Sequence, residues 1–338
     1  MMMGLMLTAA AVQAAKDWPE VTNFMATDAK AAAAWQEGLR QGLWGWLMGG
    51  KQPKRRPLAP ELVRLEQRDK FDLWQVTYRT RADRTNKALL AVPHGTRRAP
   101  ALLALHGHEA MWGEADIGAF APGHPDDFCG YFAERGYVVM QPATMNHALQ
   151  NPQWTLQGEW TWDALRGLDY LLSRPDVEPG RVSVIGLSTG AMLAIECAAL
   201  DTRLKACVAG GFFTTWNHIR TRLKIPPHCD CGITDQISDR ITITDLCGLV
   251  APRSLMIMLG REDTEFFPGA DPSKLDPKWQ TAVMVPEEFE DALAALKRIY
   301  AVVGTPDRLV YHVHPGGHSI DNEAAYRFVE ERVGGNGR

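Results

Sequence analysis

Six short apolar runs, separated by segments with helical patterns, most strongly constrain what this chain can fold into. The runs lie at residues 101–105, 136–140, 181–185, 204–209, 254–259 and 309–313. Each run is continuous rather than alternating, which is typical of strands buried on both faces of a sheet. Strands of this kind that alternate with helices form βαβ units. The sequence therefore predicts an α/β fold with a mostly parallel central sheet flanked by helices.

The first hundred residues follow a different pattern. Residues 28–48 are Ala-rich and amphipathic and end at Gly49-Gly50, which predicts a helix with a glycine stop, and the Pro-rich residues 51–60 predict a loop. Residues 71–80 alternate and residues 88–93 follow a polar turn, which predicts an antiparallel hairpin. No linker divides the rest of the chain. We therefore expect a helical extension over 16–60 and one α/β domain over 61–338.

The N-terminus allows two interpretations. Residues 1–15 are small and apolar, and Val12-Gln13-Ala14 has the pattern of a signal-peptidase site, but no basic residue precedes Lys16. The segment is either an export signal over 1–15, which implies a secreted or periplasmic protein, or an extension of a cytoplasmic one.

The charge balance excludes some classes of partner. Lys and Arg number 36 and Asp and Glu 40, which gives a net charge of −4. This balance provides no electrostatic footprint for nucleic acid. No apolar run approaches the roughly 18 residues that a membrane helix needs. We expect neither a nucleic-acid nor a membrane partner, and the oligomeric state stays open.

The cysteines suggest a metal fragment or a disulfide around Cys229-Asp230-Cys231, with His218 and His228 nearby. Zinc sites normally use Cys-x-x-Cys spacing and four ligands, so we predict no metal site. If the protein is exported, a disulfide from this pair to Cys247 or to another cysteine is the better interpretation.

The sequence Gly186-Leu187-Ser188-Thr189-Gly190 matches G-x-S-x-G between a strand and a helix. In this context the serine lies on a sharp, strained turn, and the two glycines provide the space that the turn needs. The Thr189 N–H then lies at a helix N-terminus, where it can stabilise an oxyanion. We predict Ser188 as the nucleophile and Thr189 as one oxyanion donor.

A serine nucleophile needs a histidine base and an orienting carboxylate, which follow in the order Ser, acid, His in such folds. Asp263 ends the segment Gly260-Arg261-Glu262-Asp263, which follows the run at 254–259, and Glu262 and Glu265 are its competitors. His318 lies in the Gly-rich loop after the last run, whereas His312 and His314 lie within a strand pattern. We predict Asp263 as the acid and His318 as the base.

A second oxyanion donor is expected in the loop after the run at 101–105, which reads His106-Gly107-His108. We predict the backbone N–H of His108, with Gly107 and Glu109 as alternatives.

These motifs together resemble the α/β-hydrolase superfamily. The segments HGH, GLSTG, GREDTEFFP and PGGHS are most similar to its dienelactone-hydrolase and acetyl-xylan-esterase-like branch, which is related to prolyl oligopeptidases, and the resemblance covers roughly residues 60–335. It implies an α/β-hydrolase fold and a serine carboxylic-ester hydrolase without a cofactor. Two differences favour an esterase: dienelactone hydrolases use a cysteine nucleophile, and the chain has no room for the propeller domain of prolyl oligopeptidases.

Two aromatic-rich segments are candidates for substrate contacts. Residues 141–162 contain His147 and Trp160, and residues 212–246 contain Trp216 and have the length of a lid. Aromatic rings near a site can stack on sugars, although most tryptophans are packing residues. We therefore predict an esterase for short-chain esters, including esters of plant polysaccharides. The alternatives are a serine peptidase or amidase, and a non-catalytic binding protein of the same fold.

Overall fold

The computed structural model describes residues 22–108, 115–124, 126–147, 151–219, 235–271, 273 and 284–334. Within these residues nine strands form one sheet, in the order β1-β2-β3-β5-β4-β6-β7-β8-β9. The strands are β1 (Glu61–Gln67), β2 (Phe71–Arg81), β3 (Arg84–Pro93), β4 (Ala99–Leu105), β5 (Val138–Pro142), β6 (Val177–Leu187), β7 (Ala206–Gly210), β8 (Ser254–Gly260) and β9 (Leu309–His314). The pairs β1–β2, β2–β3 and β3–β5 are antiparallel, and every other pair is parallel.

Each of the six apolar runs forms a strand of the parallel part, and the predicted hairpin is β2–β3. The structure adds β1, whose residues are all exposed. An edge strand with neither face buried has no hydrophobic pattern, which explains why the sequence analysis missed it.

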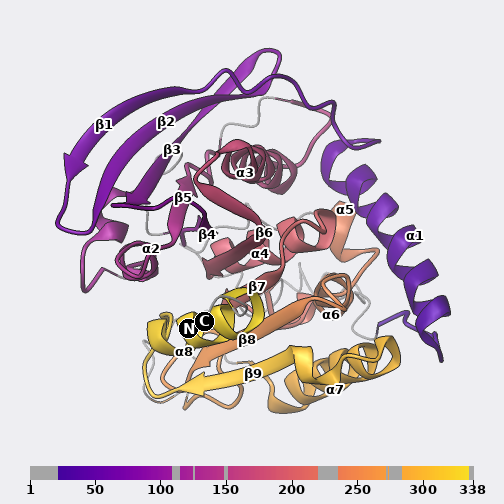
Figure 1. The fold of residues 1–338 in the computed structure, drawn as a ribbon. Helices are drawn as coiled ribbons and strands as arrows, with labels where there is room; N and C mark the ends of the chain where they lie inside the picture. Colours follow the sequence, from indigo (N-terminus) through magenta and orange to yellow (C-terminus); the bar gives the residue numbers. More distant parts are fainter. Residues whose placement is uncertain are drawn as a thin grey trace, which may run out of the picture.

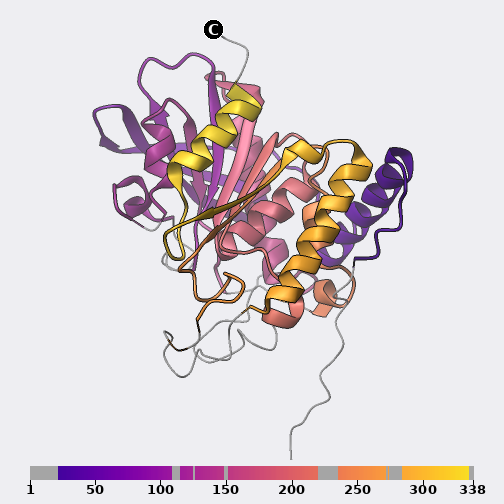
Figure 2. The same cartoon turned by 90° about the horizontal axis from the view of Figure 1, so that it is seen from below.

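Both faces of the sheet are covered by helices (Figures 1 and 2). One face packs against α1 (Ala29–Met48), α3 (Leu156–Ser173), α4 (Thr189–Leu200), α6 (Ile243–Gly248) and α7 (Pro286–Val303), and the other packs against α2 (Phe128–Ala133) and α8 (Asn322–Val329). Shorter elements are η1 (Ile117–Phe120), α5 (Asp235–Ser238), η5 (Pro306–Arg308) and η6 (Glu330–Gly334). The alternation along β4 follows from this layering, because Leu103 and Leu105 belong to the first core and Leu102 and Ala104 to the second.

Helix α1 is part of the main hydrophobic core. Asp28 caps its first turn by accepting a hydrogen bond from the Ala31 N–H, and Gly49 ends it in the left-handed conformation. Leu43 and Leu47 are fully buried, and the Leu47 carbonyl accepts a hydrogen bond of 2.9 Å from the Thr155 N–H at the start of α3. The predicted extension therefore contributes directly to the packing of the α/β domain.

Cys247 is buried and its thiol is free, so the predicted disulfide to Cys247 is wrong. Its packing inside α6 explains this, because the thiol faces the apolar core. Cys229, Cys231 and the predicted signal over 1–15 lie outside the described residues. No helix in the described ranges is long and apolar enough to cross a membrane.

Candidate active site

The turn between β6 and α4 holds Ser188 in a strained backbone conformation, with φ 57° and ψ −125°. A Cβ added at Gly186 would lie 2.1 Å from the Gly190 carbonyl oxygen, and one at Gly190 would lie 2.2 Å from the Leu105 carbonyl oxygen. Both glycines are therefore required by close backbone approach, as predicted. Strain of this kind persists only where the surrounding structure enforces it, which is common at functional sites.

Asp263 and His318 are brought together by the loops that follow β8 and β9. His318 Nδ1 lies 2.7 Å from Asp263 Oδ2. Asp263 is 1% exposed, and its other oxygen accepts hydrogen bonds from the backbone N–H groups of Glu265 and Phe266. This geometry suits an Nδ1–H that donates to the carboxylate, and in that tautomer the lone pair of the ring lies on Nε2, as a general base requires.

The competing acidic and basic residues take other positions. Glu262 is exposed, and its backbone N–H donates to the Gly316 carbonyl. His312 Nε2 lies 2.9 Å from Asp321 Oδ2 at the start of α8. His314 is buried inside the loop that carries His318, where it bonds to backbone groups.

His314 holds the shape of the His318 loop. The Gly316 N–H donates to its Nδ1 over 3.2 Å, so the ring proton lies on Nε2, which donates to the Ser319 carbonyl over 3.1 Å. The His314 carbonyl in turn accepts a hydrogen bond from the Arg261 N–H in the acid loop. The buried imidazole thus connects the two ends of the segment that contains His318, and the backbone carbonyl of His314 links that segment to the loop of Asp263.

Gly210 and Gly211, at the carboxyl end of β7, contact both the Ser188 turn and the His318 ring. The Ser188 N–H donates to the Gly210 carbonyl over 2.8 Å. Gly211 has a φ of +63°, and a Cβ there would lie 2.7 Å from Cε1 of His318. No motif in the sequence predicted a role for these glycines. A Gly-Gly pair directly after a buried strand was the signal that could have identified them.

Phe266 is a further residue of the site that no sequence motif indicated. Its ring stacks on the imidazole of His318, with centroids 5.5 Å apart and an interplanar angle of 22°. Phe266 is buried and its N–H also bonds to Asp263, so it restrains the acid and the base together.

The loop after β4 lies beside the nucleophile turn. A Cβ built on Gly107 would be 3.7 Å from the Ser188 Cβ, and His108 Nδ1 lies 2.8 Å from Thr189 Oγ1. The two predicted oxyanion residues are thus adjacent. Glu109, the alternative donor, lies outside the described residues.

The buried side chain of His106 holds this loop in place through hydrogen bonds. It is fully buried, and burial lowers the pKa of its imidazole. The Thr144 N–H donates to Nε2, so the proton of the neutral ring lies on Nδ1, 2.8 Å from the Gly107 carbonyl.

The three predicted substrate residues have different surroundings. His147 lies between the rings of His108 and Trp160, with both centroid distances 5.6 Å. Trp160 is buried and donates to the Asn146 carbonyl. Trp216 is also buried and donates to the Ile241 carbonyl, so a role in substrate binding stays a prediction that its packing does not support.

A buried carboxyl group lies behind the nucleophile helix. Glu196 of α4 is fully buried and accepts hydrogen bonds from Thr161 Oγ1, at 2.6 Å, and Gln157 Nε2, at 3.1 Å. Burial raises its pKa to about 8. Among the described residues, no group of three or more His, Cys, Asp or Glu side chains is placed to hold a metal ion.

Comparisons with known proteins agree with this architecture. The sequence model of the acetyl xylan esterase family (AXE1) matches residues 149–224, which include Ser188. YtaP of Bacillus subtilis (strain 168), named as a putative hydrolase, is 26% identical over 237 residues, or 63% of this chain and 77% of the relative.

Two solved structures extend the similarity to most of the chain. A glucuronoyl esterase from Solibacter usitatus has a TM-score of 0.66 at 20% identity, covering 90% of this chain and 94% of that one. Acetyl xylan esterase 1 from Thermoanaerobacterium sp. JW/SL YS485 has a TM-score of 0.55 at 16% identity, covering 92% and 96%. The predicted α/β-hydrolase fold is confirmed.

Proposed function

We propose that this protein is a serine carboxylic-ester hydrolase that acts through an acyl-enzyme on short-chain esters, including esters carried by plant polysaccharides. The hydrogen bond of 2.7 Å between His318 and the buried Asp263, beside a serine on a strained turn, carries the proposal. The acetyl xylan and glucuronoyl esterases among the similar proteins support the class of substrate.

The first half of the reaction forms the acyl-enzyme. His318 Nε2 takes the proton of Ser188 Oγ as the oxygen attacks the ester carbonyl carbon. The backbone N–H groups of Thr189 and His108 stabilise the resulting tetrahedral oxyanion. The imidazolium of His318 then protonates the leaving alcohol as the C–O bond breaks, and Asp263 holds the ring in the required tautomer.

The second half releases the acid. His318 takes a proton from water, which attacks the acyl carbon, and the ring returns that proton to Ser188 Oγ when the second tetrahedral intermediate collapses. Every proton transfer uses the same nitrogen, so no cofactor is required.

The Ser188→Ala variant tests this function. We expect hydrolysis of p-nitrophenyl acetate and labelling by a fluorophosphonate probe to disappear, while circular dichroism stays unchanged, because the nucleophilic oxygen alone is removed. Ser173→Ala, at the far end of α3, is the control and should keep both activities. Full turnover by Ser188→Ala would exclude the proposed nucleophile.

A further inference from the structure

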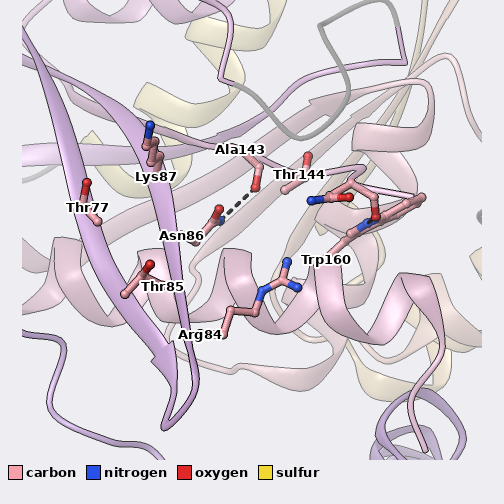
Figure 3. A pocket seen from close by; sticks show the side chains of 9 residues that line it. Thr77, Arg84, Thr85, Asn86, Lys87, Ala143, Thr144 and Trp160 are labelled. Carbon is pink, nitrogen blue, oxygen red and sulfur yellow. Dashed lines mark hydrogen bonds between the residues drawn. The ribbon is translucent and has the colours of Figure 1, made fainter. Parts of the chain in front are cut away.

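A polar cavity of about 200 Å³ lies at the carboxyl end of β5 (Figure 3). Its walls come from β2, β3, the loop after β5 and Trp160 of α3. Ser188, Asp263 and His318 are not among the lining residues. The cavity is smaller than the clefts of about 300–1,000 Å³ that enclose drug-sized ligands, so it suits a single small unit.

The lining consists mostly of groups that donate and accept hydrogen bonds, including the side chains of three threonines and two asparagines. The amide nitrogen of Asn86 donates to the Ala143 carbonyl over 2.8 Å and to the Tyr78 hydroxyl over 3.3 Å, which fixes the amide (Figure 3). Its carbonyl oxygen accepts no hydrogen bond from a described residue. A wall that combines this fixed amide with several hydroxyl groups suits a ligand that has several hydroxyl groups of its own.

The two cations of the lining differ in how their charge is balanced. Arg84 is paired with Glu159, at 3.0 Å, and with Asp163, at 2.6 Å. Lys87 is exposed and forms no ion pair with any part of the chain that the structure describes. One uncompensated positive charge therefore lies at the exposed rim of the cavity, where it favours a ligand with a carboxylate.

The cavity is connected to the active site through ring contacts. Trp160, in its wall, contacts His147, which contacts His108, whose Nδ1 is bonded to Thr189 beside Ser188. In the strand order, β5 lies two spacings from β6, β3 lies three and β2 lies four, which corresponds to about 10–19 Å. This distance is longer than one acyl group. It matches a substrate that extends along the carboxyl ends of the strands, from the nucleophile to the cavity.

We propose that this cavity is a binding subsite for one sugar unit of the substrate, and that Lys87 makes it prefer a unit with a free carboxylate, a hexuronate. The proposal rests on the proposed function for the carbohydrate nature of the substrate. The hydroxyls of the unit bond to Asn86 and the surrounding threonines, and its carboxylate pairs with Lys87.

The experiment measures binding rather than turnover. The Ser188→Ala protein is titrated with two unesterified probes, xylotetraose and a glucuronate-substituted xylotriose, and dissociation constants are measured by ligand-observed NMR. We expect both to bind, with a two- to fivefold preference for the acidic probe that disappears at high salt, which is the size of effect expected for an exposed ion pair.

Variants in the cavity then separate its two features. Adding Lys87→Met should remove the preference and leave xylotetraose binding unchanged, whereas Lys297→Met, an exposed lysine of α7, should change neither constant. Asn86→Ala should weaken both probes about tenfold. Because that variant also loses two internal hydrogen bonds, Thr85→Tyr, at an exposed lining position, is a second test and should block both probes by filling the cavity.

The outcomes distinguish this proposal from the proposed function. If neither probe binds, or if both still bind to the Thr85→Tyr variant, the subsite is overturned. This holds even if the wild-type protein hydrolyses p-nitrophenyl acetate. If the wild-type protein shows no esterase activity but the probes bind at the cavity, the proposed reaction is rejected and the subsite is retained. Equal binding of the two probes at low salt would overturn the role of Lys87.

Discussion

Two buried carboxyl groups lie in different regions of this molecule and are treated differently by their surroundings. Asp263, in the loop after β8, accepts two backbone hydrogen bonds and lies 2.7 Å from His318. Glu196, in the helical layer behind the nucleophile turn, accepts one hydrogen bond from a hydroxyl and one from an amide. The loop region is thus built to hold a carboxylate against an imidazole. In the helical layer, burial instead raises the pKa of the carboxyl group of Glu196 to about 8, because it disfavours the charged form.

Of the substitutions that test this comparison, Asp263→Asn, in the loop after β8, should reduce activity most. The amide oxygen can keep the two backbone hydrogen bonds, so the amide NH₂ would donate to Nδ1 of His318 and move the ring proton to Nε2. That nitrogen could then no longer take the proton of Ser188. We expect kcat for p-nitrophenyl acetate to fall about 10⁴-fold at unchanged fold.

The control for this substitution is Glu262→Gln, on the exposed neighbouring carboxyl group, which should keep nearly full activity. A large loss with Glu262→Gln and a small one with Asp263→Asn would reverse the assignment of the acid.

His314→Ala tests whether the loop depends on its buried imidazole. Loss of the hydrogen bonds to Gly316 and Ser319 should let His318 shift, and we expect kcat to fall about 10- to 100-fold with little change in KM, since misplacement of about 1 Å can cost about 100-fold. Steady-state kinetics measures both parameters.

His312→Ala is the matched control, because its ring lies beside that of His314 but bonds to Asp321 outside the loop. If His314→Ala raised KM alone, the ring would act on binding and not on the position of the base.

Glu196→Gln tests the carboxyl group of the helical layer through the pH dependence of protein stability. The unfolded chain loses the proton of this carboxyl near pH 4.5, whereas the folded chain keeps it until about pH 8, so wild-type stability falls as pH rises through this window. The Glu196→Gln variant has no carboxyl group at this position, so its stability does not fall with pH for this reason. Its free energy of unfolding relative to wild type should increase by about 1 kcal/mol or more between pH 5 and pH 8, measured by urea denaturation.

Glu290→Gln, at an exposed position on α7, should show no such trend. A constant difference across the pH range for Glu196→Gln would mean that the buried carboxyl titrates as it does in the unfolded chain.

Thr189→Ala should have the smallest effect, at the point where the helical layer meets the site. The variant loses the hydrogen bond to His108 but keeps the backbone N–H that we assign to the oxyanion. We expect kcat to fall less than about 10-fold, below the roughly 10²–10³-fold cost of removing an oxyanion donor. A loss in that larger range would assign the hydroxyl, and not the backbone, to the oxyanion.

Much of the fold was predictable because burial leaves a pattern in the sequence. The apolar runs predicted the parallel strands, because most of these strands are buried on both faces. Helix α3 begins at Leu156, inside the segment 141–162 where the sequence indicated only candidate substrate contacts, because Thr155 caps a first turn that contains Gly158. The missing strand β1 has no buried face, so its residues contain no periodic signal.

By itself the sequence determined the parts of this protein that local geometry requires. The glycines on either side of Ser188 predicted the strained turn, and the order of Ser188, Asp263 and His318 followed from the ends of the strands. Only the tertiary structure decided which groups surround them: Phe266 and Gly211 against His318, His314 inside its loop, and the cavity beside Trp160. The reason is physical, because these contacts join segments far apart in the chain and depend on strand order and register, which no local pattern encodes.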